Sequence, residues 1–100
     1  MAMKTITWTA GITVPHDPNA NDVYRWNWLD WLDGETITGT PVIVADSGIT
    51  AALITTGSTY VDVRISGGTA GQTHGVTVRV TSTPNARIQD RTVKFAVRER

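Results

Sequence analysis

The chain has 100 residues, of which 40% are hydrophobic and 18% charged, a balance typical of a folded domain that buries a core without disulfides or metal. Its 9 basic and 9 acidic residues cancel, which disfavours nucleic acid as a partner. It has no cysteine, which excludes disulfide scaffolds, thiolate zinc sites and cysteine nucleophiles. No apolar stretch reaches the length of a membrane span or a signal peptide, so no membrane partner is predicted.

Strand candidates follow one another along most of the chain, because abundant threonine and valine favour extended backbone. In chain order they span residues 4–9, 22–28, 36–45, 49–55, 60–65, 76–81 and 91–97. The last three alternate strictly between apolar and polar residues, which is the pattern of a half-buried strand. About seven strands at regular spacing predict an all-β fold: an antiparallel immunoglobulin-like (fibronectin type III-like) β-sandwich, in a single domain over residues 1–100.

The last three strand candidates are joined by two short segments, Gly67–Gly71 and Ser82–Ala86. Both are short enough to connect antiparallel neighbours, and the first predicts a hairpin-type corner at Gly67 and Gly68. This glycine-rich segment is not a phosphate cradle, because it holds no lysine and does not open a helix. His74, at the head of the following strand, is expected to make a local hydrogen bond at the same corner.

One short helical turn is predicted for Trp28–Leu32. Three of the 4 tryptophans lie between residues 26 and 31. Aromatic platforms stack on sugar rings or nucleobases, but filling the gap between two sheets explains Trp26 and Trp28 better. Trp8 and Trp31 are assigned to an interface. The structural core predicted from the strand faces comprises Tyr24, Trp26, Trp28, Leu32, Val61, Val63, Ile65, Val76, Val78, Val80, Val93, Phe95 and Val97.

Side chains that could support catalysis or metal binding are scattered. His16 and His74 have no third ligand at a consistent spacing, so no metal site is predicted. Asp30, Asp33 and Glu35 crowd one bend, where a general acid and base could in principle sit, but capping and turn formation around the adjacent glycine is the simpler explanation. The chain is therefore predicted to be no enzyme and to carry no cofactor.

Basic residues gather near the C-terminus. A solvated edge strand and tail is the expectation for this stretch, because charged side chains on an edge strand block aggregation. The residues concerned are Arg87, Arg91, Lys94, Arg98 and Arg100, against the acidic Asp90 and Glu99.

Two longer motifs carry a family resemblance. The first is residues 22–32 followed by 34–37 (DVYRWNWLDWL, then GETI), and the second is residues 66–74 (SGGTAGQTH). Together with Asp17-Pro18 and Arg91-Thr92, their order resembles a family of small tailed-bacteriophage virion proteins described as fiber-tail adaptors or immunoglobulin-like phage structural proteins. Asn27 and His74 depart from that pattern, which usually has aspartate and tyrosine there. Residues 1–16 are an addition, interpreted as an extra N-terminal strand or an arm.

The resemblance implies a non-enzymatic structural virion protein, an adaptor that connects tail or baseplate and fibre components through protein-protein contacts. Edge-strand pairing and a partly exposed aromatic residue are the expected means of contact. The implied partners are other phage structural proteins and further copies of the chain, within the virion tail or fibre attachment region after synthesis in the host cytoplasm. Two alternatives remain: a capsid decoration or neck protein of the same fold, and a carbohydrate-binding module with Trp8, Trp26 or Trp31 as the sugar platform.

Overall fold

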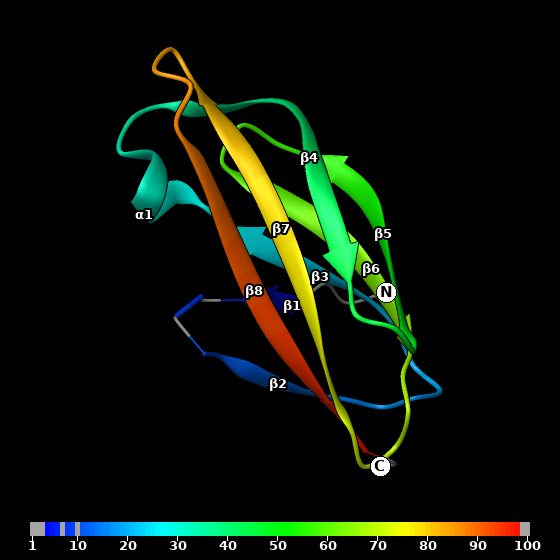
Figure 1. Cartoon of the computed structure of the whole chain (residues 1–100). Coiled ribbons are helices and arrows are strands. Elements are labelled where there is room, and N and C mark those ends of the chain that lie inside the picture. Colours follow the sequence, from blue (N-terminus) through cyan, green and yellow to red (C-terminus); the bar gives the residue numbers. More distant parts are fainter. Residues whose placement is uncertain (1–3, 7, 10, 99–100) are drawn as a thin grey trace.

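The computed structural model describes residues 4–6, 8–9 and 11–98. Glu99, Arg100 and five residues of the predicted N-terminal arm (1–3, 7 and 10) lie outside the described residues. The described chain forms two four-stranded sheets that pack face to face around one hydrophobic cluster (Figure 1). No helix in this described part is long and apolar enough to cross a membrane.

Each sheet is built from strands that are distant in sequence. The first sheet has the order β1 (Lys4–Ile6), β3 (Asn21–Asn27), β6 (Tyr60–Gly67) and β5 (Ile49–Thr56). The second has the order β2 (Thr13–His16), β8 (Ile88–Val97), β7 (Thr73–Thr83) and β4 (Thr36–Ala45). A single helical turn, α1 (Leu29–Leu32), follows β3 and lies at the same end of the molecule as the turn between β7 and β8 (Figure 1).

The predicted all-β sandwich with one helical turn is confirmed, but the strand count and the pairing differ from the prediction. The described residues form eight strands, because the unpredicted β2 forms despite Pro15. Proline is tolerated there because β2 is an edge strand, where a missing N–H breaks no ladder. The β1–β3 and β2–β8 pairs are parallel, so the expectation of a purely antiparallel fold is wrong. The immunoglobulin-like assignment itself stays a prediction.

The core lies between the two sheets and is bridged by aromatic contacts. Phe95 of β8 packs edge-on against Tyr24 of β3, with ring centroids 5.1 Å apart, and lies 6.3 Å from the Trp26 ring. Alternating valines of β6, β7 and β8 fill the rest of the layer. The structure buries Tyr24, Trp26, Trp28, Leu32, Val61, Val63, Ile65, Val76, Val78, Val80, Val93, Phe95 and Val97.

The glycine-rich segment after β6 is not the hairpin-type corner that its length predicts. β6 and β7 belong to different sheets, so residues 68–72 carry the chain from one sheet to the other. Gly67, Gly68 and Gly71 all have positive φ, which glycine adopts without strain. A hairpin is not formed, because β6 is already flanked by β3 and β5 within its own sheet.

The C-terminal basic stretch is also not the edge strand that was expected. β8 lies between β2 and β7, and the side chain of Arg91 is only 4% exposed. The described residues of the segment 4–16, called the N-terminal strap here, cover the edge of β8 with β2 and the edge of β3 with β1. In Figure 1 this strap (blue) lies on the side of the sandwich opposite β4 and β5 (green).

Candidate interaction site at the helical turn

The residues on either side of the helical turn α1 stabilise its two ends. The side-chain oxygen of Asn27 accepts a hydrogen bond from the backbone N–H of Leu29 at 3.0 Å, which satisfies one of the free donors at the start of the turn. At the other end, Asp33 and Gly34 both have positive φ and terminate it. Leu32 of the turn and Trp28, which immediately precedes it, are buried, while Leu29 is 59% exposed.

Arg91 of β8 fastens the start of this turn to the second sheet. Its guanidinium donates to the backbone oxygen of Asn27 at 3.0 Å and to both carboxylate oxygens of Asp30 at 3.2 Å. The same group lies 4.6 Å from the Trp28 ring centroid and 4.9 Å from that of Trp8. Cation–π contacts of this kind gain strength where the cation is desolvated, as this one is.

Trp8 connects this arrangement to the N-terminal strap. Its indole N–H donates to the backbone oxygen of Thr92 at 2.9 Å, so the ring is anchored to β8 by its edge as well as by its stacking on Arg91. The strap and the start of α1 therefore both attach to β8 at Arg91 and Thr92.

Arg87 fastens the opposite end of α1 in a similar way. It donates to the backbone oxygens of Trp31 at 3.2 Å and Leu32 at 2.7 Å, and its guanidinium lies 4.6 Å from the Trp31 ring centroid. Positive charge near the last carbonyls of a helical turn is favourable, because those oxygens have no partner within the turn. The Arg87 Nε also donates to Glu35 at 2.7 Å.

Glu35 joins the end of the turn to the β7–β8 hairpin. Its carboxylate accepts hydrogen bonds from the Ser82 hydroxyl at 3.0 Å and the Asn85 backbone N–H at 3.1 Å, in addition to Arg87. Desolvation by itself would raise the pKa of Glu35, but these hydrogen bonds outweigh it and lower the pKa below its ordinary value. The carboxylate is therefore ionised at neutral pH.

Asp30 is an ionised carboxylate as well, although most of its side chain faces solvent. The hydrogen bonds from Arg91 lower its pKa below the ordinary value. Of the three carboxylates of the bend, Asp30 pairs with Arg91 of β8 and Glu35 pairs with Arg87, which immediately precedes β8. The third, Asp33, takes a left-handed backbone conformation next to Gly34. In this arrangement, Asp30 and Glu35 serve as ion-pair partners that hold the bend in place.

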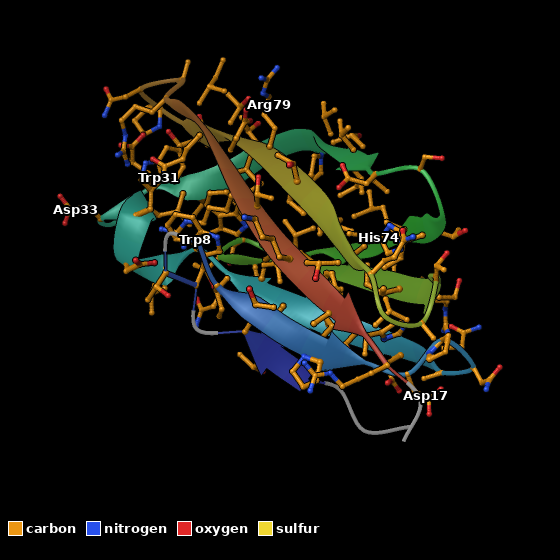
Figure 2. The ribbon with its side chains drawn as sticks, turned by 60° about the horizontal axis from the view of Figure 1, so that its bottom comes forward. Trp8, Asp17, Trp31, Asp33, His74 and Arg79 are labelled. Carbon is orange, nitrogen blue, oxygen red and sulfur yellow. The ribbon has the colours of Figure 1, made fainter. Side chains whose placement is uncertain are left out.

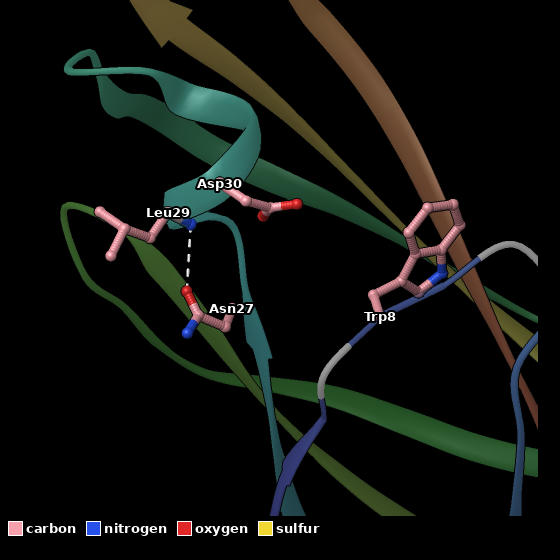
Figure 3. A pocket seen from close by; sticks show the side chains of 4 residues that line it. All are labelled: Trp8, Asn27, Leu29 and Asp30. Atoms are coloured by element: carbon pink, nitrogen blue, oxygen red, sulfur yellow. Dashed lines mark hydrogen bonds between the residues drawn. The ribbon is translucent and has the colours of Figure 1, made fainter.

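A hollow of about 330 Å³ opens beside the start of α1, lined by Trp8, Asn27, Leu29 and Asp30. Figure 3 shows the Asp30 carboxylate pointing toward Trp8 across this hollow, while the Leu29 side chain extends to the other side. The lining combines an aromatic ring, an apolar side chain, an amide and a carboxylate. No group of three or more potential metal ligands occurs within the described residues.

The four tryptophans divide into two kinds. Trp26 and Trp28 are fully buried, and their indole nitrogens have no hydrogen-bond partner among the described residues. Neither can serve as a sugar platform, so that alternative is wrong for Trp26. Trp8 and Trp31 are half-buried and pack against the rim of the core. Both lie at the α1 end of the molecule, as Figure 2 shows.

His74 lies toward the other end of the molecule in Figure 2. The Nε2 atom of this buried side chain accepts a hydrogen bond from the Thr69 backbone N–H at 3.2 Å, so it pins the crossover between the sheets. Gly68 packs against Val97 in the same region, and a Cβ on Gly68 would lie 2.6 Å from a Val97 methyl group. Gly67, Gly68 and His74 thus meet at a crossover that is remote from the hollow.

The prediction of a solvated charge is wrong for Arg91. This residue is buried and links the strap, α1 and β8. A usable signal was present in the alternation of β8, because Arg91 shares the inward side with Val93, Phe95 and Val97.

Comparisons with known proteins point to one family. The family described as "Podophage GP4 fiber-tail adaptor protein gp77" matches residues 16–96, which is most of the chain. No curated protein matches the sequence. A solved structure described as the solution structure of amebosin has a TM-score of 0.49 and 15% identity, with 96% of each chain covered, a similarity too low to carry an argument.

The matched region contains β3, α1, β4 to β7 and all of β8 except its last residue, together with Arg87, Arg91 and the two carboxylates that they bind. A family of fiber-tail adaptors is a class of structural phage tail proteins, which interact with other structural proteins of the virion, and it is not an enzyme class. The chain belongs to the podophage GP4 fiber-tail adaptor (gp77) family.

Proposed function

We propose that this chain is an adaptor that connects tail or baseplate components to fibre components through protein-protein contacts, as one of several copies in the particle. The single observation that carries the proposal is the family match over residues 16–96. The charged side chains around α1 hold this turn to the rest of the sandwich, so the contact surface is sought elsewhere on the described residues.

Strand β4 supplies the best surface for such contacts. It is the edge of the second sheet, and its outward side chains Val42 and Val44 are 51% and 59% exposed. Exposed valines on an edge strand favour burial against another protein, and the free backbone groups of the edge can pair with an added strand. A register shift between Thr38 and Val42 divides the pairing of β4 with β7 into two stretches, and the two exposed valines lie in the second one, from Val42 to Ala45.

The rest of the outer face limits how a partner can approach β4. Val42 pairs with Arg79 of β7, and Arg79 forms an exposed ion pair with Asp90 of β8 at 2.7 Å. A partner that covers the valines therefore meets a charged pair at the border of the patch. Such a polar border adds orientation and discrimination more than affinity.

The experiment that tests this proposal removes the chain from the phage that encodes it. Particles that assemble without the chain are expected to have tails without attached fibres in electron micrographs, and added purified chain is expected to restore attachment. The Val42→Asp/Val44→Asp double variant should fail to restore it, because two carboxylates would have to be desolvated in the contact.

The matched control is Thr38→Asp/Thr40→Asp, which adds the same charges at exposed positions of the same strand, before the stretch that holds the two valines. This control should restore fibre attachment, and both variants should retain the unfolding midpoint of the parent chain. If particles without the chain carry normal fibres but lack a feature of the capsid surface or neck, the adaptor role is wrong. That result would support the capsid decoration or neck alternative.

A further inference from the structure

The hollow beside α1 combines surfaces that no single segment of the chain supplies. Trp8 comes from the N-terminal strap, whereas Asn27, Leu29 and Asp30 come from the end of β3 and the start of α1. The family match begins at residue 16, so Trp8 lies outside the matched region and the other three residues lie within it. The completed hollow therefore depends on a part of this chain that the family match does not cover.

Trp8 is held rigidly where it lines the hollow. Its indole N–H is bonded to the Thr92 backbone oxygen at 2.9 Å, and its ring stacks on the Arg91 guanidinium at 4.9 Å. An aromatic ring that is already anchored loses little conformational freedom when a ligand stacks on it. The apolar part of the lining is therefore preorganised.

The polar part of the lining offers hydrogen-bonding groups, and the negative charge of Asp30 is compensated by Arg91. Asp30 has a side chain that is 73% exposed, and its two oxygens already face the buried Arg91 at 3.2 Å. Each carboxylate oxygen can accept more than one hydrogen bond. Asn27 uses its side-chain oxygen to hold the Leu29 N–H, which leaves the NH₂ donor of this exposed amide for a ligand.

This charge arrangement discriminates between ligand classes. A cationic ligand would meet the positive charge of Arg91 as well as the negative charge of Asp30, so its electrostatic gain is small. A purely apolar ligand would have to desolvate the carboxylate without replacing its hydrogen bonds. A neutral ligand with an apolar face and several hydroxyl groups satisfies both parts of the lining.

We propose that the hollow between Trp8 and Asp30 binds a neutral saccharide, with the apolar face of one sugar ring on the Trp8 indole and its hydroxyl groups hydrogen-bonded to Asp30 and Asn27. The hollow, at about 330 Å³, lies at the small end of the range for ligand pockets, which selects a mono- or disaccharide unit. This inference does not depend on the adaptor role, since it concerns a glycan ligand and a different surface from β4.

The test follows the indole N–H signals of ¹⁵N-labelled protein by NMR during titration with neutral methyl glycosides. The panel comprises the glucoside, galactoside, mannoside and N-acetylglucosaminide. At least one glycoside should move the Trp8 signal saturably and leave those of Trp26 and Trp28 unchanged, because these two rings are buried. Comparison with the Trp8→Phe variant assigns the Trp8 signal.

Two variants locate the binding. Trp8→Ala should weaken the affinity for that glycoside by about tenfold or more, because a stacking platform is lost. Asn27→Ala should weaken it several-fold, provided that the backbone amide spectrum shows a folded protein. The matched control is Trp31→Phe, which changes the other half-buried tryptophan and lies outside the hollow, and it should leave the affinity unchanged.

Several results would overturn the proposal. These are the absence of a saturable Trp8 shift with every glycoside, or an equal glycoside affinity in the Trp8→Ala variant. A larger Trp8 shift with arginine methyl ester than with any glycoside would show that the hollow takes a cationic side chain of a partner protein instead. The Val42→Asp/Val44→Asp variant should bind the glycoside as the parent chain does, whether or not it restores fibre attachment. The two proposals can therefore fail separately.

Discussion

Arg91, on the last strand, binds Asp30, on the helical turn, by two hydrogen bonds of 3.2 Å from its two terminal nitrogens to the two carboxylate oxygens. The arginine is 4% exposed and the aspartate 73%, so the pair runs from the rim of the core to the surface. The pair joins residues 61 positions apart, and its aspartate lines the hollow that Trp8 completes.

Replacing Arg91 should destabilise the whole fold. Arg91→Ala leaves a void between two indoles and a backbone oxygen of Asn27 without its partner, and we expect a loss of about 3 kcal/mol in the free energy of unfolding. Arg91→Lys should recover only part of this, because an ammonium group lacks the planar fork that serves three acceptors. Urea unfolding followed by tryptophan fluorescence measures both losses.

The control for this prediction is Arg79→Ala, which removes a bidentate ion pair with Asp90 on the exposed outer face. Surface pairs contribute little in water, so its urea midpoint should stay close to that of the parent. Equal losses for Arg91→Ala and Arg79→Ala would contradict the central role of Arg91.

Acid should destabilise the joint around α1. The pKa of Asp30 is lowered chiefly by its hydrogen bonds from Arg91, and the pKa of Glu35 is lowered by hydrogen bonds from Asn85, Ser82 and Arg87 that outweigh its desolvation. Both carboxylates then bind fewer protons in the folded state than in the unfolded state. Their stabilisation is therefore complete above the unfolded pKa values of about 4 and is lost as the pH falls toward the lowered folded values.

Urea midpoints measured from neutral pH down to about pH 3 should show this fall, and the Glu35→Gln variant should show a shallower one. Asp90, whose pKa Arg79 lowers by hydrogen bonding, contributes in the same direction in both proteins. If the urea midpoints of the Glu35→Gln variant and the parent change identically with pH, Glu35 does not contribute to the loss of stability in acid.

The glycines of the crossover should differ in their tolerance of alanine. Gly68 and Gly71 both have positive φ, but an added Cβ has open space at Gly71 and meets Val97 at 2.6 Å at Gly68. Gly71→Ala should cost about 1–2 kcal/mol for backbone strain alone. Gly68→Ala should cost about 1–3 kcal/mol more, because overlap with a packed side chain adds to the strain. Thermal unfolding of the two variants compares them, and equal melting temperatures would mean that Val97 moves aside freely.

Acrylamide quenching should divide the tryptophan fluorescence into two classes. Trp26 and Trp28 are fully buried and should be protected, whereas Trp8 and Trp31 are half-buried and should be quenched. The double variant Trp8→Phe/Trp31→Phe should retain only the protected class. Strong quenching in that variant would show that the core opens to solvent.

Local chain chemistry made a large part of this fold predictable. Alternation in residues 60–65, 76–81 and 91–97 indicated three strands and their inward faces, because side-chain direction in a strand depends only on the parity of the position. The end of α1 was equally readable from Gly34, which takes a positive φ in the structure. The family resemblance rested on the same local motifs, and the match over residues 16–96 confirmed it.

Arg91 and Lys94 show what local chemistry does not reveal. Both are basic residues of one strand, yet Arg91 is buried among aromatic rings and Lys94 is exposed. The difference arises because Trp8 of the strap and Trp28, just before the turn, contact Arg91 from 83 and 63 residues away in the sequence. No local sequence pattern indicates such a long-range contact.

The sequence by itself therefore determined most of the strands, the helical turn, the inward apolar residues of the alternating strands and the family. The tertiary structure alone decided which strands are neighbours, that the strap pairs in parallel with β3 and β8, and that Trp8 completes a hollow with Asp30. The physical reason is that strand propensity and alternation act over a few residues, whereas pairing partners are selected by burial over the whole core.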